Sequence, residues 1–333
     1  MTVAAASELS RRDARALAAA TCVLCLLAAT SLFVGAGGVD PMAVLTGQAD
    51  PAQMRLLLVS RLPRTLAVIL AGLSLGVAAV IMQMLFRNRF VEPTTAGTAE
   101  AASLGLVMTA VIAPEIPVGA RMAVAAVTSL AVTLIFLRMV ERIPGRSALI
   151  VPLLGLMLGG VVEAMATFVA YRYDLLQSLA AWTNGDFSGV LRGRYELLWI
   201  GGLLAASAYF VADRFTVAGM GEDFATNLGL NYGRIVSLGL VIVSLVTAAS
   251  VATVGAVPFL GLIVANLVGI FAGDNLRRSL PWIALSGAGF LLVCDLTGRL
   301  IRYPYEIPVG TVAGVAGSAI FLVLLLRGNA RLG

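Results

Sequence analysis

Residues 62–84 read LPRTLAVILAGLSLGVAAVIMQM and decide the fold class of this chain. The stretch is 23 residues long and holds a single charged side chain, Arg64, close to its start. A helix needs about 20 apolar residues to cross the hydrocarbon core of a bilayer. The bilayer core contains no water that could bond the backbone N–H and C=O groups. Only helices and closed barrels, which pair these groups internally, can span it. The stretch therefore predicts a transmembrane helix.

The same pattern recurs along the whole chain. The 333 residues are 59% hydrophobic and only 12% charged, whereas a soluble domain carries about a quarter charged residues. Alternating segments of about ten residues, which are typical of membrane barrels, are absent from the sequence. We expect an all-α integral membrane protein with residues 1–333 in one transmembrane domain. About ten helices are predicted, at 14–35, 62–84, 95–113, 118–138, 147–170, 195–213, 234–254, 257–272, 280–298 and 308–327.

The composition argues against catalysis. The sequence holds no His and no Lys, so all 23 basic residues are Arg. A phosphate-binding loop that ends in Gly-Lys-Ser/Thr cannot form without Lys, and neither a His-based zinc site nor a Ser-His-Asp triad can form without His. The cysteines Cys22, Cys25 and Cys294 lie in apolar runs, where Cys behaves as a small hydrophobic residue. We expect no enzymatic activity, no metal, no cofactor and no nucleic-acid partner.

Arginine placement predicts the orientation, because loops on the cytoplasmic side are enriched in basic residues. With ten helices and a cytoplasmic N-terminus, fourteen arginines lie inside and nine outside. Both termini are therefore expected in the cytoplasm. Nine external arginines are still a large number, and this excess suggests a function.

Two of these external arginines, Arg61 and Arg64, flank Leu62-Pro63 at the predicted outer start of the second helix. Pro favours the first turn of a helix, and Arg favours planar, bidentate recognition of carboxylates. The motif could dock an acidic partner. Alternatively, the two side chains could anchor the helix at the membrane interface by snorkelling.

The predicted cytoplasmic loop at 214–234 contains a second candidate site. Gly221 suits an N-cap, and Glu222 and Asp223 suit the first turn of a helix dipole. Gly229 suits the helix stop. The other members of the candidate site are Ala225 and Leu228. A short helix here could insert into a partner protein or lie on the membrane surface.

Three carboxylates, Glu100, Glu163 and Asp295, fall inside predicted transmembrane helices. Ionisable groups at membrane depth are costly and usually face a cavity or a partner. Asp295 and Arg299 are four residues apart, so they could pair on one helix face. Glu100 is near a helix start, where a negative charge is favourable. Glu163 and Asp295 could equally line a transport pathway.

Taken together and in order, several motifs give the chain a resemblance to the permease family of iron–siderophore, haem and cobalamin ABC importers, the FecCD/BtuC-like permeases. The resemblance covers about residues 55–327. The motifs are RLPRT at 61–65, RNRFVEP at 87–93, AGT at 96–98, WTNGDFSG at 182–189, the loop at 221–229, FLGLIV at 259–264, RRSLP at 277–281 and EIPVG at 306–310.

This resemblance implies a type II ABC importer permease in the cytoplasmic (inner) membrane of a bacterium. It implies three partners: an ABC ATPase, a second permease subunit that is identical or homologous, and a periplasmic or lipid-anchored substrate-binding protein. Residues matching Arg61, Arg64 and Arg299 meet glutamates of the binding protein in that family. The loop that matches 221–229 docks on the ATPase in that family.

The chain departs from the family pattern at Ala265-Asn266, where Pro-His is common, and at Gly269, where an arginine is common. Asn266 is a further candidate residue of the transport pathway. An asparagine at this position makes the chain resemble the catecholate-siderophore branch of the family. Cobalamin or haem remains an alternative cargo. Two other classes also remain open: a secondary transporter driven by an ion gradient through Glu163 or Asp295, and a membrane scaffold or intramembrane enzyme.

Overall fold

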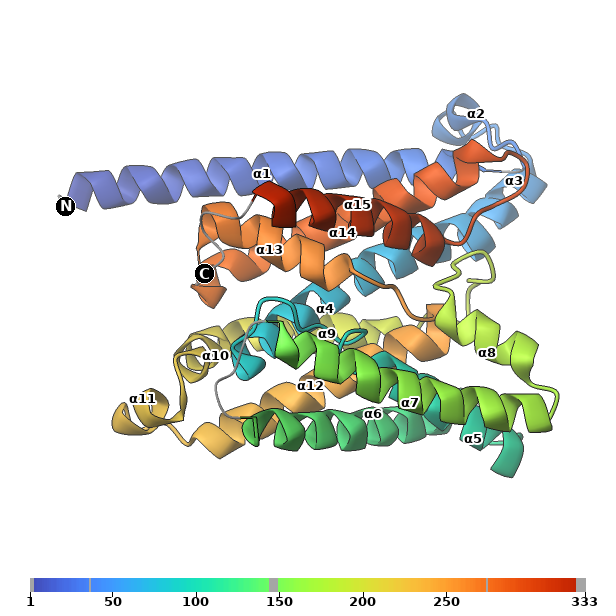
Figure 1. Ribbon diagram of the computed structural model, residues 1–333. Helices are drawn as coiled ribbons and strands as arrows, with labels where there is room; N and C mark the ends of the chain where they lie inside the picture. Colours follow the sequence, from blue (N-terminus) through green and yellow to red (C-terminus); the bar gives the residue numbers. More distant parts are fainter. Residues whose placement is uncertain (1–2, 36, 144–148, 274, 328–333) are drawn as a thin grey trace.

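The computed structural model describes residues 3–35, 37–143, 149–273 and 275–327, and the regular secondary structure in this part of the chain is all helical (Figure 1). The long helices are α1 (Val3–Phe33), α4 (Leu62–Phe86), α6 (Val118–Glu141), α7 (Ile150–Arg172), α12 (Tyr232–Val254), α14 (Leu276–Ile301) and α15 (Val309–Arg327). The shorter elements are α2 (Pro41–Leu45), α3 (Pro51–Leu56), the π-helical turn η1 (Leu57–Arg61), α5 (Thr98–Ile112), α8 (Leu176–Thr183), α9 (Leu198–Phe210), α10 (Ala212–Gly219), α11 (Glu222–Asn227) and α13 (Leu260–Ala272).

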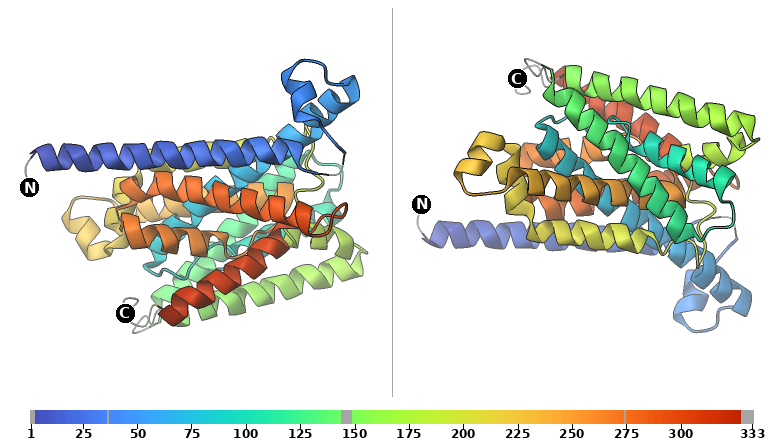
Figure 2. Two further views of the ribbon diagram at one scale, coloured as in Figure 1. Left: turned by 90° about the horizontal axis from the view of Figure 1, so that it is seen from above. Right: turned by 90° about the horizontal axis from the view of Figure 1, so that it is seen from below.

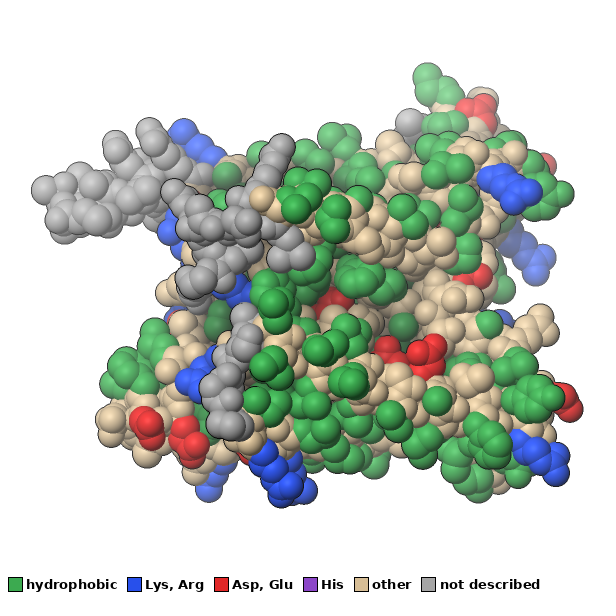
Figure 3. Space-filling view, in the orientation of Figure 1, with side chains coloured by type: hydrophobic (Ala, Val, Ile, Leu, Met, Phe, Trp, Pro, Cys, Tyr) green, Lys and Arg blue, Asp and Glu red, His purple; other side chains and the backbone are tan. Residues whose placement is uncertain are grey.

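The lengths of these helices confirm an integral membrane fold. Within the described residues, 6 helical segments are long and apolar enough to cross a membrane, and 7 if α9 and α10 count as one bent span. The shorter apolar helices α5, α13 and α15 account for the remaining predicted segments. Each of the predicted apolar stretches is therefore a helix. Apolar side chains cover the flank of the molecule in Figure 3, and arginines gather toward its two ends.

Helix α4 forms the centre of the bundle. It packs against α14, α9, α12 and α13. In its most apolar stretch 83% of the residues are buried, whereas in the corresponding stretch of α1 only 6% are buried. Helix α1 lies along the edge of the bundle against α14 (Figures 1 and 2). Helices α4 and α14 approach closely at two glycines: a Cβ on Gly72 would lie 2.5 Å from the carbonyl oxygen of Gly287. These glycines let the α4 and α14 backbones touch.

Helix α1 begins at Val3 and not at residue 14, and two further helices differ clearly from their predicted bounds. The second helix does not begin at residue 62, because α3 and η1 continue into α4 as one helical segment from Pro51 to Phe86. Pro63 would clash with the carbonyl of residue 59 in a regular helix, and the π-helical turn Leu57–Arg61 accommodates it. The predicted helix 195–213 bends by 71° between α9 and α10. The residue at the bend, Val211, gave no breaker signal.

The two candidate sites lie at opposite ends of the bundle. The start of α1, the end of α15 and the short helix α11 share one end in Figures 1 and 2. Helices α2, α3 and α8 lie at the other end, together with the start of α4. A protein with this layout can bind different partners at its two faces.

Candidate functional site

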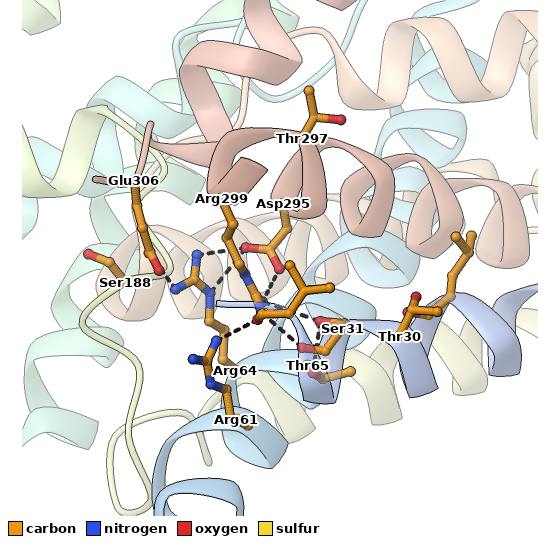
Figure 4. Close-up of polar contacts among 12 residues, drawn as sticks. Thr30, Ser31, Arg61, Arg64, Thr65, Ser188, Asp295, Thr297, Arg299 and Glu306 are labelled. Atoms are coloured by element: carbon orange, nitrogen blue, oxygen red, sulfur yellow. Dashed lines mark hydrogen bonds and ion pairs between the residues drawn. The ribbon is translucent and has the colours of Figure 1, made fainter. Parts of the chain in front are cut away.

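Three arginines and two carboxylates form a cluster at the end of the bundle where α4 begins (Figure 4). We call it the arginine cluster: Arg61, Arg64, Asp295, Arg299 and Glu306. Arg64 donates to Asp295 Oδ1 from Nε at 3.1 Å and from Nη2 at 2.8 Å, and to Glu306 Oε2 from Nη1 at 2.6 Å. Arg299 pairs with Asp295 Oδ2 from one turn further along α14. A single carboxylate, Asp295, thus joins two guanidinium groups.

The arginine cluster also holds the end of α1. Arg61 Nη1 donates to the Val34 carbonyl at 2.6 Å, and Arg299 Nη1 donates to the carbonyls of Ser31 and Val34 at 2.9 and 3.0 Å. Carbonyls at a helix C-terminus lack intrahelical partners. Because cations are favourable at that end of the helix dipole, the two arginines stabilise the position of α1.

Burial distinguishes this cluster from an interfacial anchor. Arg61 and Arg64 are each 6% exposed, Arg299 is 1% exposed and Asp295 is fully buried. Snorkelling side chains would reach water, and these do not. Within the cluster, three positive charges face two negative ones, which leaves one net positive charge. A buried excess charge is costly, so the site is electrostatically suited to one further carboxylate.

The outcome for the predicted outer residues is mixed. The structure brings Arg61, Arg64 and Arg299 together and confirms the Asp295–Arg299 pair. Their docking role stays a prediction. The contacts of Arg64 with Asp295 and Glu306 were not predicted, since they join residues 231 and 242 positions apart.

At the opposite end, the short helix α11 has the predicted shape. Gly221 has φ of +119° and precedes its first turn. Two backbone hydrogen bonds cap the C-terminus of α11: Gly229 N–H donates to the Thr226 carbonyl, and Leu230 N–H donates to the Ala225 carbonyl. Ala225 is the buried residue of α11, so this side of the helix packs against the rest of the protein.

The outer face of α11 is apolar and uncovered. Phe224 is 49% exposed and Leu228 is 58% exposed, one turn apart. Glu222 and Asp223 are exposed in the first turn. An apolar pair flanked by two acids on a protruding helix is suited to a protein groove, because two large side chains can be buried there at once.

Glu92, which lies between α4 and α5, has a structural role that its local sequence did not predict. Its Oε1 accepts from Phe259 N–H at 2.9 Å and from Thr94 Oγ1 at 2.7 Å, and its Oε2 accepts from Leu262 N–H at 2.8 Å. Glu92 therefore caps the N-terminus of α13, where a negative charge is favourable. Burial raises the pKa of the Glu92 carboxyl above its ordinary value, and these hydrogen bonds oppose that rise. Its only sequence signal was membership of the RNRFVEP motif.

The other predicted polar residues have separate positions. Glu163 is exposed, and together with Glu100 it lines a pocket between α5 and α7. Asn266 Nδ2 donates to the carbonyls of Arg89 and Leu262 at 2.9 and 2.6 Å. No group of three or more metal-ligating side chains occurs in the described part of the chain.

A helical bundle of spanning length with a charged cluster at one end and an uncovered short helix at the other is the architecture of a polytopic membrane protein. The chain matches the model of the FecCD transport family over residues 22–327, and it belongs to this family. It is a permease subunit of an ABC import system and is not itself catalytic. Such a system implies ATPase and binding-protein partners.

Curated relatives cover nearly the whole chain. The petrobactin import system permease protein YclN of Bacillus subtilis (strain 168) is 47% identical over 308 residues, 92% of this chain and 97% of that protein. The ferric-anguibactin transport system permease protein FatD of Vibrio anguillarum is 41% identical over 302 residues, 91% and 96% of the two chains. The vitamin B12 import system permease protein BtuC of Salmonella arizonae is 31% identical over 329 residues, 97% of each.

A solved structure confirms the fold. A chain described as a metal-chelate type ABC transporter in an inward-facing conformation superposes with a TM-score of 0.79 and 23% identity. The match covers 94% of this chain and 99% of that chain. At this identity the likeness establishes the type II importer permease architecture.

Proposed function

We propose that this chain is the permease subunit through which a ferric siderophore crosses the cytoplasmic membrane, driven by a separate ATPase. The supporting observation is the difference in identity among relatives. Two permeases named for petrobactin and anguibactin are 47% and 41% identical to this chain, whereas one named for vitamin B12 is 31% identical. Cobalamin is thus the less favoured cargo.

Uptake by the complete importer tests this proposal. Vesicles that contain the permeases, the ATPase and the binding protein should accumulate radiolabelled ferric petrobactin or ferric anguibactin when ATP is supplied. Labelled cobalamin serves as the competing cargo. Cobalamin uptake without siderophore uptake would overturn the proposal, and uptake that survives without ATP hydrolysis but collapses with an uncoupler would indicate a secondary transporter.

We also propose that the arginine cluster docks an acidic surface of the substrate-binding protein. Its one net positive charge supports this role, because a carboxylate from a partner would neutralise it. Arg61 is the contact chosen for the test, because reversing Arg64 or Arg299 would break their ion pairs with Asp295. This placement puts the cluster on the periplasmic side, with α11 and both termini on the cytoplasmic side.

Replacing Arg61 with Glu is expected to weaken binding of the substrate-binding protein by about tenfold or more, since a charge pair becomes a repulsion. Affinity is measured on permease in nanodiscs at low and high salt. Arg55→Glu is the matched control, because Arg55 is exposed on α3 at the same end and lies outside the cluster. Restored affinity when a partner glutamate is exchanged for arginine would confirm the contact. Unchanged affinity of Arg61→Glu would contradict it.

We propose that α11 docks in a groove of the ATPase and transmits its closure to the permease. The supporting observation is the exposed pair Phe224 and Leu228 on a short helix whose C-terminal end is capped by backbone hydrogen bonds. The double variant Phe224→Ala with Leu228→Ala is expected to lose most ATPase copurification, because two large apolar contacts disappear.

The control for α11 is Leu326→Ala. Leu326 is 73% exposed near the end of α15, at the same end of the bundle. It should retain the ATPase. Equal loss of the ATPase in the control and the α11 variant would show that α11 is not the docking element.

We propose, finally, that a second permease subunit, identical or homologous, lies beside this one. Large apolar side chains of α6 and α7 are exposed, among them Val127, Met157 and Phe168. Lipid or a second subunit covers such a surface in a membrane. Crosslinking of single-cysteine variants on α7 would distinguish the two.

A further inference from the structure

A small cavity lies between the end of α12 and the start of α13, beside the segment that joins α4 to α5. Its volume is about 10 Å³, which is about the smallest space that holds one water molecule. The polar side chains in its lining are Glu92, Thr94, Thr247 and Ser250. We call it the α12–α13 cavity. Nothing in the family assignment or in the function proposed above gives it a role.

Two hydroxyl groups of α12 line this cavity. Thr247 and Ser250 are each 1% exposed, and neither Thr247 Oγ1 nor Ser250 Oγ has a hydrogen-bond partner among the described residues. A hydroxyl inside a helix can bond to the carbonyl four residues earlier, as Thr253 of the same helix does to Ala249 at 2.7 Å. Thr247 and Ser250 make no such bond. Because a buried polar group without a partner costs free energy, both hydroxyls are suited to a polar molecule in the cavity.

The lining also contains a buried carboxylate. Glu92 is 2% exposed, and it accepts hydrogen bonds from the backbone amides of Phe259 and Leu262 at the start of α13. The two hydroxyls of α12 do not bond to it directly. An ionised carboxylate only accepts hydrogen bonds. A molecule that connects it to the hydroxyls must therefore be able to donate.

Size and chemistry together select water as this molecule. A volume of about 10 Å³ admits one water and no larger group. A buried water typically makes about three hydrogen bonds, and the lining offers Glu92, Thr247 and Ser250. Hard metal cations take about six or more oxygen ligands, whereas the Glu92 oxygens already accept from amides.

We propose that one water molecule binds in the α12–α13 cavity and joins Thr247 and Ser250 to Glu92. The water accepts from the two hydroxyls and donates to the carboxylate. Since Glu92 also caps the start of α13, the water connects α12 to that helix start. This inference does not depend on the cargo or on the docking roles proposed above.

Thermal unfolding of the purified full-length chain in detergent micelles tests the proposal by the sign of a change in Tm. Ser250→Ala removes one partner of the water, so the Tm should fall by about 1–4 °C, which corresponds to about one hydrogen bond. If no water were bound, the variant would remove an unpaired buried hydroxyl, and the Tm would stay unchanged or rise.

Ser244→Ala is the matched control. Ser244 lies on the same helix, is 1% exposed and has an Oγ without a hydrogen-bond partner among the described residues, but it does not line the cavity. Its replacement should leave the Tm unchanged or raise it. A fall in Tm equal to that of Ser250→Ala would contradict a role for the cavity.

Thr247→Val is a second variant, which keeps the shape of the side chain and removes only the hydroxyl. It should lower the Tm as Ser250→Ala does. Hydrogen exchange at the Leu262 amide should accelerate in both variants and not in Ser244→Ala, because only the first two weaken the connection to Glu92. An unchanged or raised Tm in both cavity variants would overturn the proposal.

A cryo-EM density map of the wild-type chain in the assembled importer gives a direct readout. In a map that resolves ordered water, density is expected within about 3.2 Å of Thr247 Oγ1, Ser250 Oγ and a Glu92 oxygen. A map that shows other buried waters and no density there would overturn the proposal. The Tm is also compared in sodium chloride and choline chloride. Equal values support water, whereas a sodium-dependent rise that Thr247→Val removes would identify a bound cation and overturn it.

Discussion

Replacing Asp295 with Ala is expected to destabilise this permease by about 3–5 kcal/mol, because it leaves buried arginines without their shared carboxylate. Asp295 is fully buried, accepts two bonds from Arg64 and pairs with Arg299. Removing one partner of a buried ion pair is much more costly than removing the whole pair. The free energy of unfolding in mixed micelles, or the yield of monodisperse protein, measures the effect.

The chain offers a matched control for Asp295. Asp213 pairs with Arg277 at 2.8 Å, and the two side chains are 60% and 61% exposed. Exposed ion pairs contribute little to stability because water and salt screen them, so Asp213→Ala should change stability little. Asp295→Asn keeps the shape of the side chain and should fall between the two. Equal effects of Asp295→Ala and Asp213→Ala would contradict the proposed importance of burial.

Replacing Glu92 with Ala is expected to destabilise the fold by about 3 kcal/mol or more, since buried amide donors lose a charged acceptor. The bonds to Phe259 and Leu262 hold the start of α13 beside the segment that joins α4 to α5. Phe259 itself has φ of +61°, so this helix start needs support from outside. Hydrogen exchange at the amides of Phe259 and Leu262 should accelerate more than exchange elsewhere in α13.

Two further variants make the Glu92 test specific. Glu92→Gln retains one carbonyl acceptor and should be less harmful than Glu92→Ala. Glu100→Ala is the control, because Glu100 is a nearby carboxylate with a buried oxygen, Oε2, that has no hydrogen-bond partner among the described residues. Its removal should cost less than removal of Glu92. Uniform exchange rates across α13 in Glu92→Ala would show that the carboxylate does not hold that helix start.

The importer assignment changes how the outer arginines are to be tested. Reversing Arg61 and Arg64 together would not test the docking role alone. In the structure, a glutamate at position 64 would face Asp295 and Glu306, so loss of uptake would report instability as well as lost docking. Arg61→Glu alone, with rescue by charge exchange on the partner, separates the two effects.

The helices and the short element α11 could be predicted from sequence because their signals are local. The length of an apolar run determines a spanning helix, and Gly221 and Gly229 flank the same short helix. The break after α9 was missed since Val211 carries no local signal. Family motifs identified Arg61, Arg64 and Arg299 as a group, although they suggested a solvent-facing surface.

The sequence by itself therefore determined the membrane-spanning class, the helix positions and the two faces at which partners are proposed to bind. Only the tertiary structure decided which charges meet. Arg64 reaches Asp295 and Glu306 across 231 and 242 residues, and Glu92 reaches α13 across 167 and 170. The physical reason is that helix length and capping depend on neighbours in the chain, whereas the partner of a buried charge depends on which helices pack together.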